Sequence, residues 1–338
     1  MGGMKVNDRA VSLLEQYDLE VLRTRKGRGA ILCETSNGLY IFKEYEGAIE
    51  KLAFQNRLLS QLKEQGEACI EQIVPTKEGN LIVTDYDRTN YFLKTYFEGR
   101  ECNINDENER KAAVQFLAKI HKKLTVPQEE EYYPKANILS EFEKHNREMK
   151  KVKRFLRDKS QKNGFEIFLM QNFDLFYEKA LSATENLKEY FTDLEKEYLD
   201  TKKPVCHGDF QYHNLIKTDS GFALINFEKS VVDYQIRDLY YFLRKLLEKN
   251  NWSIKLGEEL IYAYNEELSL GAYDMIQLYY RFAYPEKFWK IVNFYYNNSK
   301  VWIPDKTCEK LGNLIQAEEA RQMFLDYLSN NFISRNKN

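Results

Sequence analysis

The chain has 338 residues, of which 43% are hydrophobic and 30% charged, a composition typical of a globular protein with one large domain or two. Fifty basic residues against 52 acidic ones leave a net charge of −2, which argues against a dedicated nucleic-acid-binding protein. No run of about 18 apolar residues occurs, so we expect no membrane span. Five cysteines without a CxxC pair, and a start without a signal-peptide core, favour an intracellular protein with reduced thiols.

The first 97 residues predict a small antiparallel sheet with one packed helix. Alternating stretches separated by short turns indicate strands, and apolar residues at helical spacing, closed by Gly66, indicate the helix. The expected strands are 19–25, 30–35, 39–45, 80–86 and 91–97, and the expected helix is 49–66.

Beyond Gly99 the pattern is mainly helical, with one embedded hairpin formed by 215–217 and 222–227. The expected helices are 107–124, 137–158, 165–199 and 237–249, followed by further helices to about residue 329. We therefore expect an α+β protein with a sheet-rich N-lobe (1–97), a larger helical C-lobe (98–330) and a frayed tail (331–338).

The stretch "HGDFQYHN", residues 207–214, contains the first candidate catalytic residues. Asp209 and Asn214 lie five residues apart on a loop between apolar runs, so one turn can present both. Phosphoryl transfer needs a carboxylate to accept the proton of the attacking hydroxyl, and oxygen ligands to hold Mg²⁺. The alternative is that both side chains only cap turns.

Together with "INFEKSVVDYQIRDLYYFLRK" downstream, this stretch resembles the signature of the aminoglycoside phosphotransferase and choline kinase superfamily. Three further stretches, "GNLIVTDYDRTNYFLKTYFEGREC", "LAKIH" and residues 281–304, resemble the spore coat CotS family, a branch of that superfamily. The resemblance covers about residues 15–330. It implies a two-lobed, protein-kinase-like fold with ATP between the lobes.

The resemblance also implies site residues. Asp209 would be the catalytic base, Asn214 a metal ligand, and Lys43 the partner of the nucleotide phosphates. The alternative for Lys43 is an ordinary strand lysine that points to water. Glu50, or another acid on helix 49–65, would orient Lys43. Gly27 and Gly29 would cover the nucleotide, and the segment around Phe97 would contact the purine.

Asn226 departs from the superfamily pattern, which has a metal-bridging aspartate there. Asparagine keeps an oxygen ligand but loses a full negative charge. Glu228 is two residues further on, and if 224–228 is extended, both side chains share a face. Glu228 would then supply the missing carboxylate, and Mg²⁺ would be held by Asn214, Asn226 and Glu228.

Three hypotheses therefore stay open. The protein is an ATP- and Mg²⁺-dependent kinase for a small hydroxyl-bearing molecule, a nucleotide-binding relative with weak or no activity, or a structural component of the spore coat. The resemblance implies a place in the cytoplasm of the mother cell or, after deposition, in the spore coat, with other coat proteins as partners. The substrate does not follow from the sequence.

Overall fold

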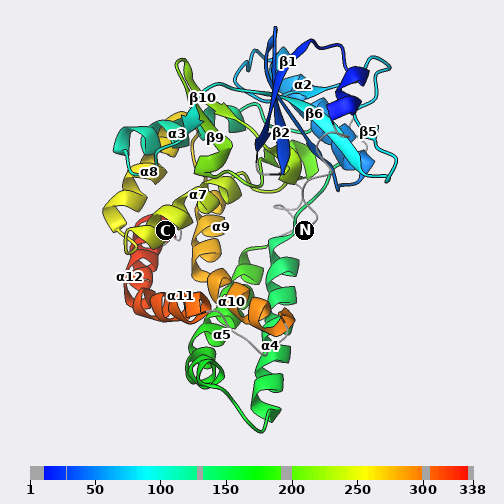
Figure 1. Ribbon diagram of the computed structural model, residues 1–338. Helices are drawn as coiled ribbons and strands as arrows, with labels where there is room; N and C mark the ends of the chain where they lie inside the picture. The colour runs from blue at the N-terminus through cyan, green and yellow to red at the C-terminus, as the bar shows by residue number, and fades with distance from the viewer. Residues whose placement is uncertain (1–10, 28, 128–131, 192–199, 299–304, 334–338) are drawn as a thin grey trace. The chain divides into compact units, whose positions relative to one another are not determined.

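The computed structural model describes residues 11–27, 29–127, 132–191, 200–298 and 305–333. The chain forms two compact units. The first comprises Met1–Pro134 and Val205–Val232, and the second comprises Lys135–Pro204 and Asp233–Asn338. All described strands belong to the first unit, and the second is built of helices (Figure 1). The expected lobe boundary at residue 97 stays a prediction, because the compact units divide the chain at other positions.

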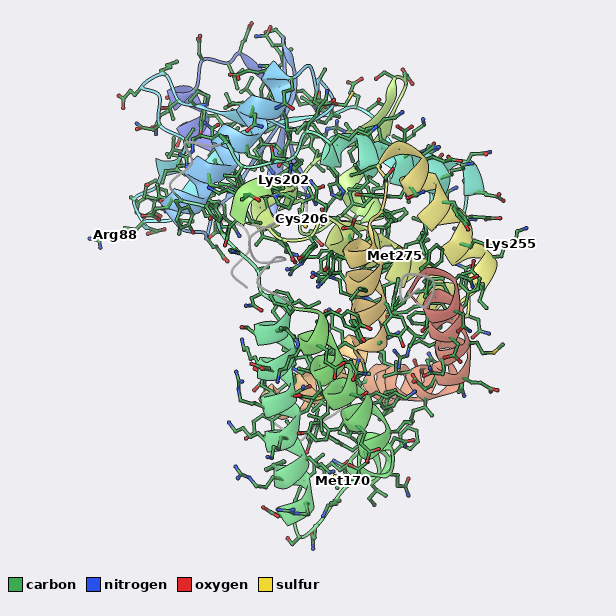
Figure 2. The ribbon with its side chains drawn as sticks, turned by 180° about the vertical axis from the view of Figure 1, so that it is seen from behind. Arg88, Met170, Lys202, Cys206, Lys255 and Met275 are labelled. Atoms are coloured by element: carbon green, nitrogen blue, oxygen red, sulfur yellow. The ribbon has the colours of Figure 1, made fainter. Side chains whose placement is uncertain are left out.

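The main sheet of the first unit is antiparallel, with the strand order β1-β2-β3-β6-β4 and β5 paired to β6. Its strands are β1 (Val21–Gly27), β2 (Ala30–Thr35), β3 (Gly38–Glu44), β4 (Ile73–Val74), β5 (Val83–Thr84) and β6 (Asn90–Tyr96). The five strands expected from alternation are confirmed, although β5 is shorter than its pattern. Arg88, in the turn between β5 and β6, is exposed and points away from the sheet (Figure 2).

The register of β3 against β6 decides which side chains share a face of this sheet. Lys43 lies opposite Phe92, and Ile41 lies opposite Lys94, so these four side chains project to one side. The other side carries an apolar core. That core consists of Leu14, Tyr17, Ile31, Cys33, Phe42, Val83, Tyr91 and Leu93. Because one face is apolar, a one-residue slip would bury both lysines in this core, which fixes the register.

Two helices and two small sheets complete the first unit. Helix α2 (Ile49–Glu64) buries one apolar side, and helix α3 (Glu107–His121) begins at Asp106, whose side chain accepts a hydrogen bond from Glu109 N. The small sheets have the orders β10-β9-β7 and β11-β8. Their strands are β7 (Arg100–Glu101), β8 (Val205–Cys206), β9 (Leu215–Thr218), β10 (Gly221–Leu224) and β11 (Val231–Val232). The pairing of β9 with β7 attaches residues 205–232 to the N-terminal part of the chain, and the pairing of β8 with β11 joins the two ends of that segment.

The second unit is an all-helical assembly in which α4 packs along α5 (Figure 1). Its helices are α4 (Ile138–Asp158), α5 (Gly164–Tyr190), α7 (Ile236–Lys249), α8 (Ile254–Glu267), α9 (Ala272–Ala283), α10 (Glu286–Asn297), α11 (Asp305–Gln316), α12 (Glu318–Leu328) and η4 (Ser329–Ile333). The predicted helical character is confirmed. Residues 192–199 of the predicted helix 165–199, and 334–338 of the predicted tail, lie outside the described residues. None of the helices described here is long and apolar enough to cross a membrane.

Candidate active site

The loop that carries Asp209 follows directly after β8, which is paired with β11. The main-chain N–H of Asp209 donates to Nδ1 of His207 at 3.2 Å. Because Nδ1 accepts, Nε2 carries the proton and donates to the carbonyl oxygen of Ile225 at 2.9 Å. His207 is fully buried. It therefore ties the Asp209 loop to the segment that precedes Asn226.

Gly208 is required at the start of this loop. Its φ is +81°, and a Cβ there would lie 2.1 Å from the carbonyl oxygen of Lys229. We expect Gly208→Ala to lower the free energy of unfolding by about 1–3 kcal/mol, because both the backbone conformation and the close approach become strained. Urea unfolding followed by circular dichroism measures this loss.

The matched control for this prediction is Gly164→Ala. Gly164 begins α5, and a Cβ there meets nothing within 4 Å. This control is expected to leave stability unchanged or slightly raised. Equal stability of Gly208→Ala and the wild type would contradict the role given to Gly208.

Asp209 itself faces a lysine. Nζ of Lys229 lies 2.9 Å from Oδ2 of Asp209, and the side chains are 65% and 28% exposed. An ion pair this exposed contributes little to stability. The Asp209 carboxylate is therefore partly open to solvent and paired with an exposed lysine.

Asn214 and Asn226 lie together, as the sequence predicted for two oxygen-bearing side chains of one site. Nδ2 of Asn226 donates to Oδ1 of Asn214 at 2.8 Å, and Nδ2 of Asn214 donates to the main-chain oxygen of Asp209 at 2.8 Å. Oδ1 of Asn226 accepts from Nζ of Lys94 at 3.4 Å. An ammonium can only donate, which fixes the orientation of both amides. An aspartate at 226 could not donate to Asn214, so asparagine is matched to its neighbour here.

The expectation that 224–228 is extended is wrong. Strand β10 ends at Leu224, Asn226 has left-handed φ and ψ of 67° and 58°, and a 3₁₀ turn, η3 (Phe227–Lys229), follows. Asparagine adopts this backbone conformation more readily than most residues. Glu228 therefore reaches the neighbourhood of Asn226 through a turn and not along a shared strand face.

Four charged side chains on the polar side of the main sheet form what we call the ion cluster: Lys43, Glu71, Lys94 and Glu228. Oε1 of Glu228 lies 2.6 Å from Nζ of Lys43 and 2.9 Å from Nζ of Lys94. Nζ of Lys94 lies 2.7 Å from Oε2 of Glu71. Lys94 and Glu71 are only 1% and 2% exposed, against 26% for Lys43 and 24% for Glu228. The cluster thus runs from a buried pair to a half-exposed pair.

The acid that partners Lys43 comes from an unexpected element. An acid of helix 49–65 such as Glu50 was expected, but Glu50 is exposed on the first turn of α2 and the ion pair is made by Glu228 of η3. Helix α2 contributes an amide instead, since Nε2 of Gln55 donates to the carbonyl oxygen of Phe227 at 3.1 Å. Lys43 is held in the cluster and is not a strand lysine that simply points to water.

The charges of the cluster support one another. Burial raises the pKa of Glu228, but the ammonium groups of Lys94 and Lys43 outweigh that effect and lower it to about 2. Burial lowers the pKa of Lys94, and Glu71 and Glu228 outweigh this and raise it. The opposite charges therefore keep Lys94 and Glu228 ionised at neutral pH.

This arrangement predicts an acid-sensitive contribution to stability. The pKa of Glu228 lies near 4.5 in the unfolded chain and at about 2 in the folded protein, so the contribution is complete above pH 4.5 and is lost as the pH falls toward 2. We expect the unfolding free energy of Glu228→Gln to fall less steeply over this interval than that of the wild type. Urea midpoints measured between those pH values test this. Glu64→Gln, at an exposed position of α2, is the control, and equal slopes for all three proteins would contradict the prediction.

Lys94, Glu71 and Lys229 were missed by the sequence analysis. A signal existed for the first two, because each is a charged residue inside an apolar run, "YFLKTYF" and "CIEQIV". A lysine that interrupts an apolar run in a strand indicates a charge buried with a partner. No local pattern distinguishes Lys229 from other surface lysines.

Gly27 and Gly29 flank the turn between β1 and β2. Gly29 has a φ of +68°, which favours glycine, whereas a Cβ on Gly27 would meet only Ala30 O at an ordinary 3.6 Å. Ala30 lies opposite Lys43 in the register, so this turn is at the same end of the sheet as Lys43. The glycines thus lie near the ion cluster along the sheet.

Phe97 lies away from the charges, in an apolar patch. It packs, partly buried, against Ile216, Ala223 and Ile225, and Ile225 directly precedes Asn226. The next glycine, Gly99, approaches strand β9 so closely that a Cβ would lie 2.2 Å from Lys217 O. The first unit therefore holds both an apolar patch and a polar cluster, which a purine with attached phosphates needs.

The contacts of the expected Mg²⁺ ligands do not fit a divalent cation. Of Asn214, Asn226 and Glu228 only one is a carboxylate, and its Oε1 already accepts from two ammonium groups. The two amide oxygens accept from Asn226 Nδ2 and Lys94 Nζ. Among the described residues, no group of three or more His, Cys, Asp or Glu side chains lies together in a way that could hold a metal ion. The metal-ligand set of Asn214, Asn226 and Glu228 stays a prediction.

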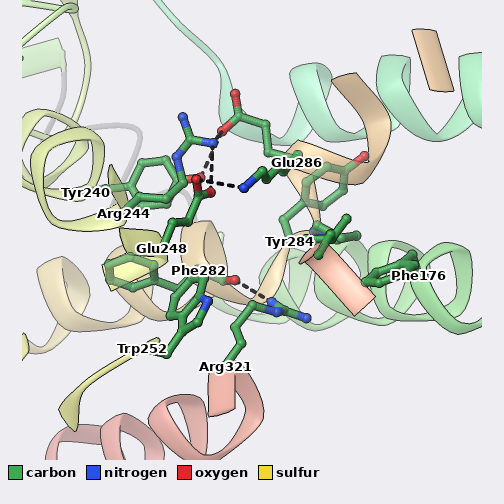
Figure 3. A pocket seen from close by; sticks show the side chains of 12 residues that line it. Phe176, Tyr240, Arg244, Glu248, Trp252, Phe282, Tyr284, Glu286 and Arg321 are labelled. Carbon is green, nitrogen blue, oxygen red and sulfur yellow. Dashed lines mark hydrogen bonds and ion pairs between the residues drawn. The ribbon is translucent and has the colours of Figure 1, made fainter. Parts of the chain in front are cut away.

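The second unit contains a pocket of its own, lined by aromatic and charged side chains that include Tyr240, Arg244, Trp252 and Glu286 (Figure 3). Its volume of about 30 Å³ holds a water molecule but no nucleotide. Burial raises the pKa of Glu286, and Arg244 and Lys290 outweigh it and lower it to about 2. Tyr240 donates to Glu286 Oε2 at 2.8 Å. These contacts stabilise the junction of α7 and α10, and the pocket is not a candidate active site.

Comparison with known proteins places these observations in a family. Residues 10–328 match the family described as "Spore coat putative kinase YutH". The chain is 24% identical over 319 residues to spore coat protein S of Bacillus subtilis (strain 168), covering 90% of this chain and 88% of that protein. The predicted relation to spore coat kinase-like proteins is thereby confirmed.

Solved structures agree on the fold. An aminoglycoside phosphotransferase from Alicyclobacillus acidocaldarius has a TM-score of 0.81 at 18% identity, over 94% of this chain and 95% of that one. Spectinomycin phosphotransferase in complex with ADP and spectinomycin has a TM-score of 0.63 at 15% identity, over 94% and 92%. Amicoumacin kinase with AMP-PNP and Ca²⁺ has a TM-score of 0.62 at 10% identity, over 93% and 92%. The predicted α+β, kinase-like fold is confirmed.

Proposed function

Because the chain belongs to the family described as "Spore coat putative kinase YutH", we propose that it transfers the γ-phosphoryl group of ATP to a hydroxyl of a small molecule. The observation that carries this proposal is the convergence, within the first unit, of Asp209 and Asn214 with the ion cluster through one chain of hydrogen bonds. The relatives solved with ADP and spectinomycin, or with AMP-PNP, support a nucleotide donor and a small acceptor.

Each residue has a role in this proposal. Oδ of Asp209 takes the proton of the acceptor hydroxyl, whose oxygen attacks the γ-phosphorus while the bond to the bridging β,γ-oxygen breaks and ADP leaves. Lys43, which is 26% exposed and anchored by Glu228, offers its ammonium to the phosphates. The purine contacts the patch around Phe97, and the turn of Gly27 and Gly29 covers the phosphates. The acceptor is a small hydroxyl-bearing compound.

Nucleotide binding is the first step to test. ATP is expected to raise the melting temperature of the wild type, and Lys43→Met should reduce this rise, because a phosphate partner is lost. Lys63→Met, which removes an exposed lysine from the last turn of α2, is the matched control and should respond as the wild type does. Absence of a shift with any nucleotide would overturn the proposal.

Turnover is the second step. Incubation of the protein and ATP with amino alcohols, choline, sugars and aminoglycosides, followed by ³¹P NMR, is expected to reveal a phosphate ester with at least one acceptor class. Formation of the ester should depend on Asp209.

A second candidate function is favoured by one observation. Oε1 of Glu228 and Oδ2 of Asp209 are both paired with lysines, which suits a binding protein that has ceased to catalyse. In this reading the protein assembles with other coat proteins and reaches the spore coat from the mother cell. ATP binding without turnover, combined with normal coat assembly in an Asp209→Asn strain, would favour this candidate over the kinase.

A further inference from the structure

The ammonium group of Lys94 contacts two of the three side chains expected to bind the metal. It is 3.4 Å from Oδ1 of Asn226 and 2.9 Å from Oε1 of Glu228. Its third contact is Oε2 of Glu71 at 2.7 Å. Three oxygens around a centre are the contacts that an ammonium with three donors requires. The side chain of Lys94 is only 1% exposed, so it is a buried part of the site.

The charge of the surroundings agrees with a monovalent centre. Two ammonium groups and two carboxylates make the ion cluster neutral, and Asn226 adds no charge. A divalent cation is bound best where carboxylates are in excess. Adding such an ion beside Lys94 would place like charges a few ångström apart inside the protein, which is strongly unfavourable.

The hydrogen-bond directions point the same way. From Lys94 the donors run to Asn226, from Asn226 to Asn214, and from Asn214 to the main-chain oxygen of Asp209. Each step fixes the next amide, so the ammonium at one end orients the loop of the catalytic base at the other.

We propose that Lys94 is a built-in cation of this site: its ammonium takes the place between Asn226 and Glu228 that a divalent ion would otherwise occupy. As a consequence, nucleotide binding needs no divalent ion held by these residues. The statement on nucleotide binding rests on the proposed function, whereas the role of Lys94 as a cation does not. The two are tested separately.

The first test titrates Mn²⁺, followed by electron paramagnetic resonance, into four proteins. Wild type and Asn226→Asp are expected to bind no Mn²⁺ through this site, because restoring the carboxylate leaves the ammonium in place. Asn226→Asp combined with Lys94→Met is expected to gain a Mn²⁺ site, with a Kd about a hundredfold below that of any Mn²⁺ binding by Asn226→Asp alone. The reason is that a unit positive charge a few ångström away is removed.

Asn226→Asp combined with Lys43→Met is the matched control. It removes one positive charge from the same cluster but keeps Lys94, so it should not gain the Mn²⁺ site. A gain equal to that of the Lys94 variant would overturn the assignment to Lys94. Should the Lys94 variant fail to fold, the other proteins still decide. If wild type or Asn226→Asp binds Mn²⁺ and Glu228→Gln abolishes this binding, the proposal is refuted. If neither wild type nor Asn226→Asp binds Mn²⁺ at this site, the proposal is upheld.

The second test compares the Kd of ATP in EDTA and in Mg²⁺. The two values are expected to agree within about threefold, a small difference on the free-energy scale. A Kd that rises more than about tenfold in EDTA would overturn the statement on nucleotide binding. A protein that binds no ATP in either buffer would refute the proposed function, and the Mn²⁺ titration would still decide the role of Lys94.

Discussion

Asp209→Asn is expected to lower the turnover number of ATP-dependent phosphorylation by about a thousandfold, since a positioned general base contributes about 10²–10⁴-fold. Asparagine keeps the shape of the side chain but cannot take a proton. The contacts that hold the loop survive the change, because Asn214 and His207 bind main-chain atoms of residue 209. The loss should therefore appear in kcat, with little change in ATP binding.

The measurement is the initial rate of phosphate-ester formation with the best acceptor, together with the Kd of ATP for each protein. Asp219→Asn is the matched control, because Asp219 is an exposed aspartate in the turn between β9 and β10 of the same unit. It should keep wild-type rates. A wild-type rate in Asp209→Asn would exclude Asp209 as the base, and a loss of ATP binding would assign it to nucleotide binding instead.

Lys94→Met is expected to lower the free energy of unfolding by about 3–5 kcal/mol, the range for removing one partner of a buried ion pair. Glu71 is only 2% exposed and would keep a carboxylate without its ammonium partner. Its other oxygen still accepts from Phe227 N at 2.9 Å, which does not balance a charge. Urea denaturation of the purified variant measures the loss.

Two comparisons separate the buried charge from a simple loss of packing. Lys63→Met, at an exposed position, should change stability by less than about 0.5 kcal/mol. Combining Lys94→Met with Glu71→Gln should recover part of the loss, because the unpaired carboxylate is gone. If the double variant is less stable than Lys94→Met, or if Lys94→Met loses less than about 1 kcal/mol, the ion pair is not the cause.

The parts of the fold that were predicted from the sequence have strong local periodicity. Strands β1 to β3 alternate, and helices α2, α4 and α7 carry apolar stripes, so each is visible in a short window. The two-residue strands β4, β7, β8 and β11 were not predicted, because a pair such as Val205 and Val232 is defined by distant residues and not by local pattern. Strand β10 was predicted too long, since left-handed Asn226 ends it.

In the candidate site, too, a local pattern reveals some residues, whereas others depend on contacts between distant parts of the chain. Asp209 and Asn214 were found because their spacing on one loop is a local property. The partner of Lys43 was sought on the neighbouring helix, but it lies on η3, more than 180 residues along the chain. Lys94 of β6, and Glu71 just before β4, join the candidate site only through contacts with η3, which is distant in sequence.

The attachment of residues 205–232 to the N-terminal sheet has a consequence for biosynthesis. Glu101 pairs with Ile216, and Ile70 bridges to Leu224, across a stretch that includes 135–204 of the other unit. On the ribosome the first unit therefore stays incomplete until its last segment has been translated, long after most of its strands. Pairings this distant in sequence form slowly and expose unpaired edges meanwhile. A nascent chain halted before Val205 thus presents a sheet without Asp209, without Glu228, and with Lys94 facing Glu71 alone.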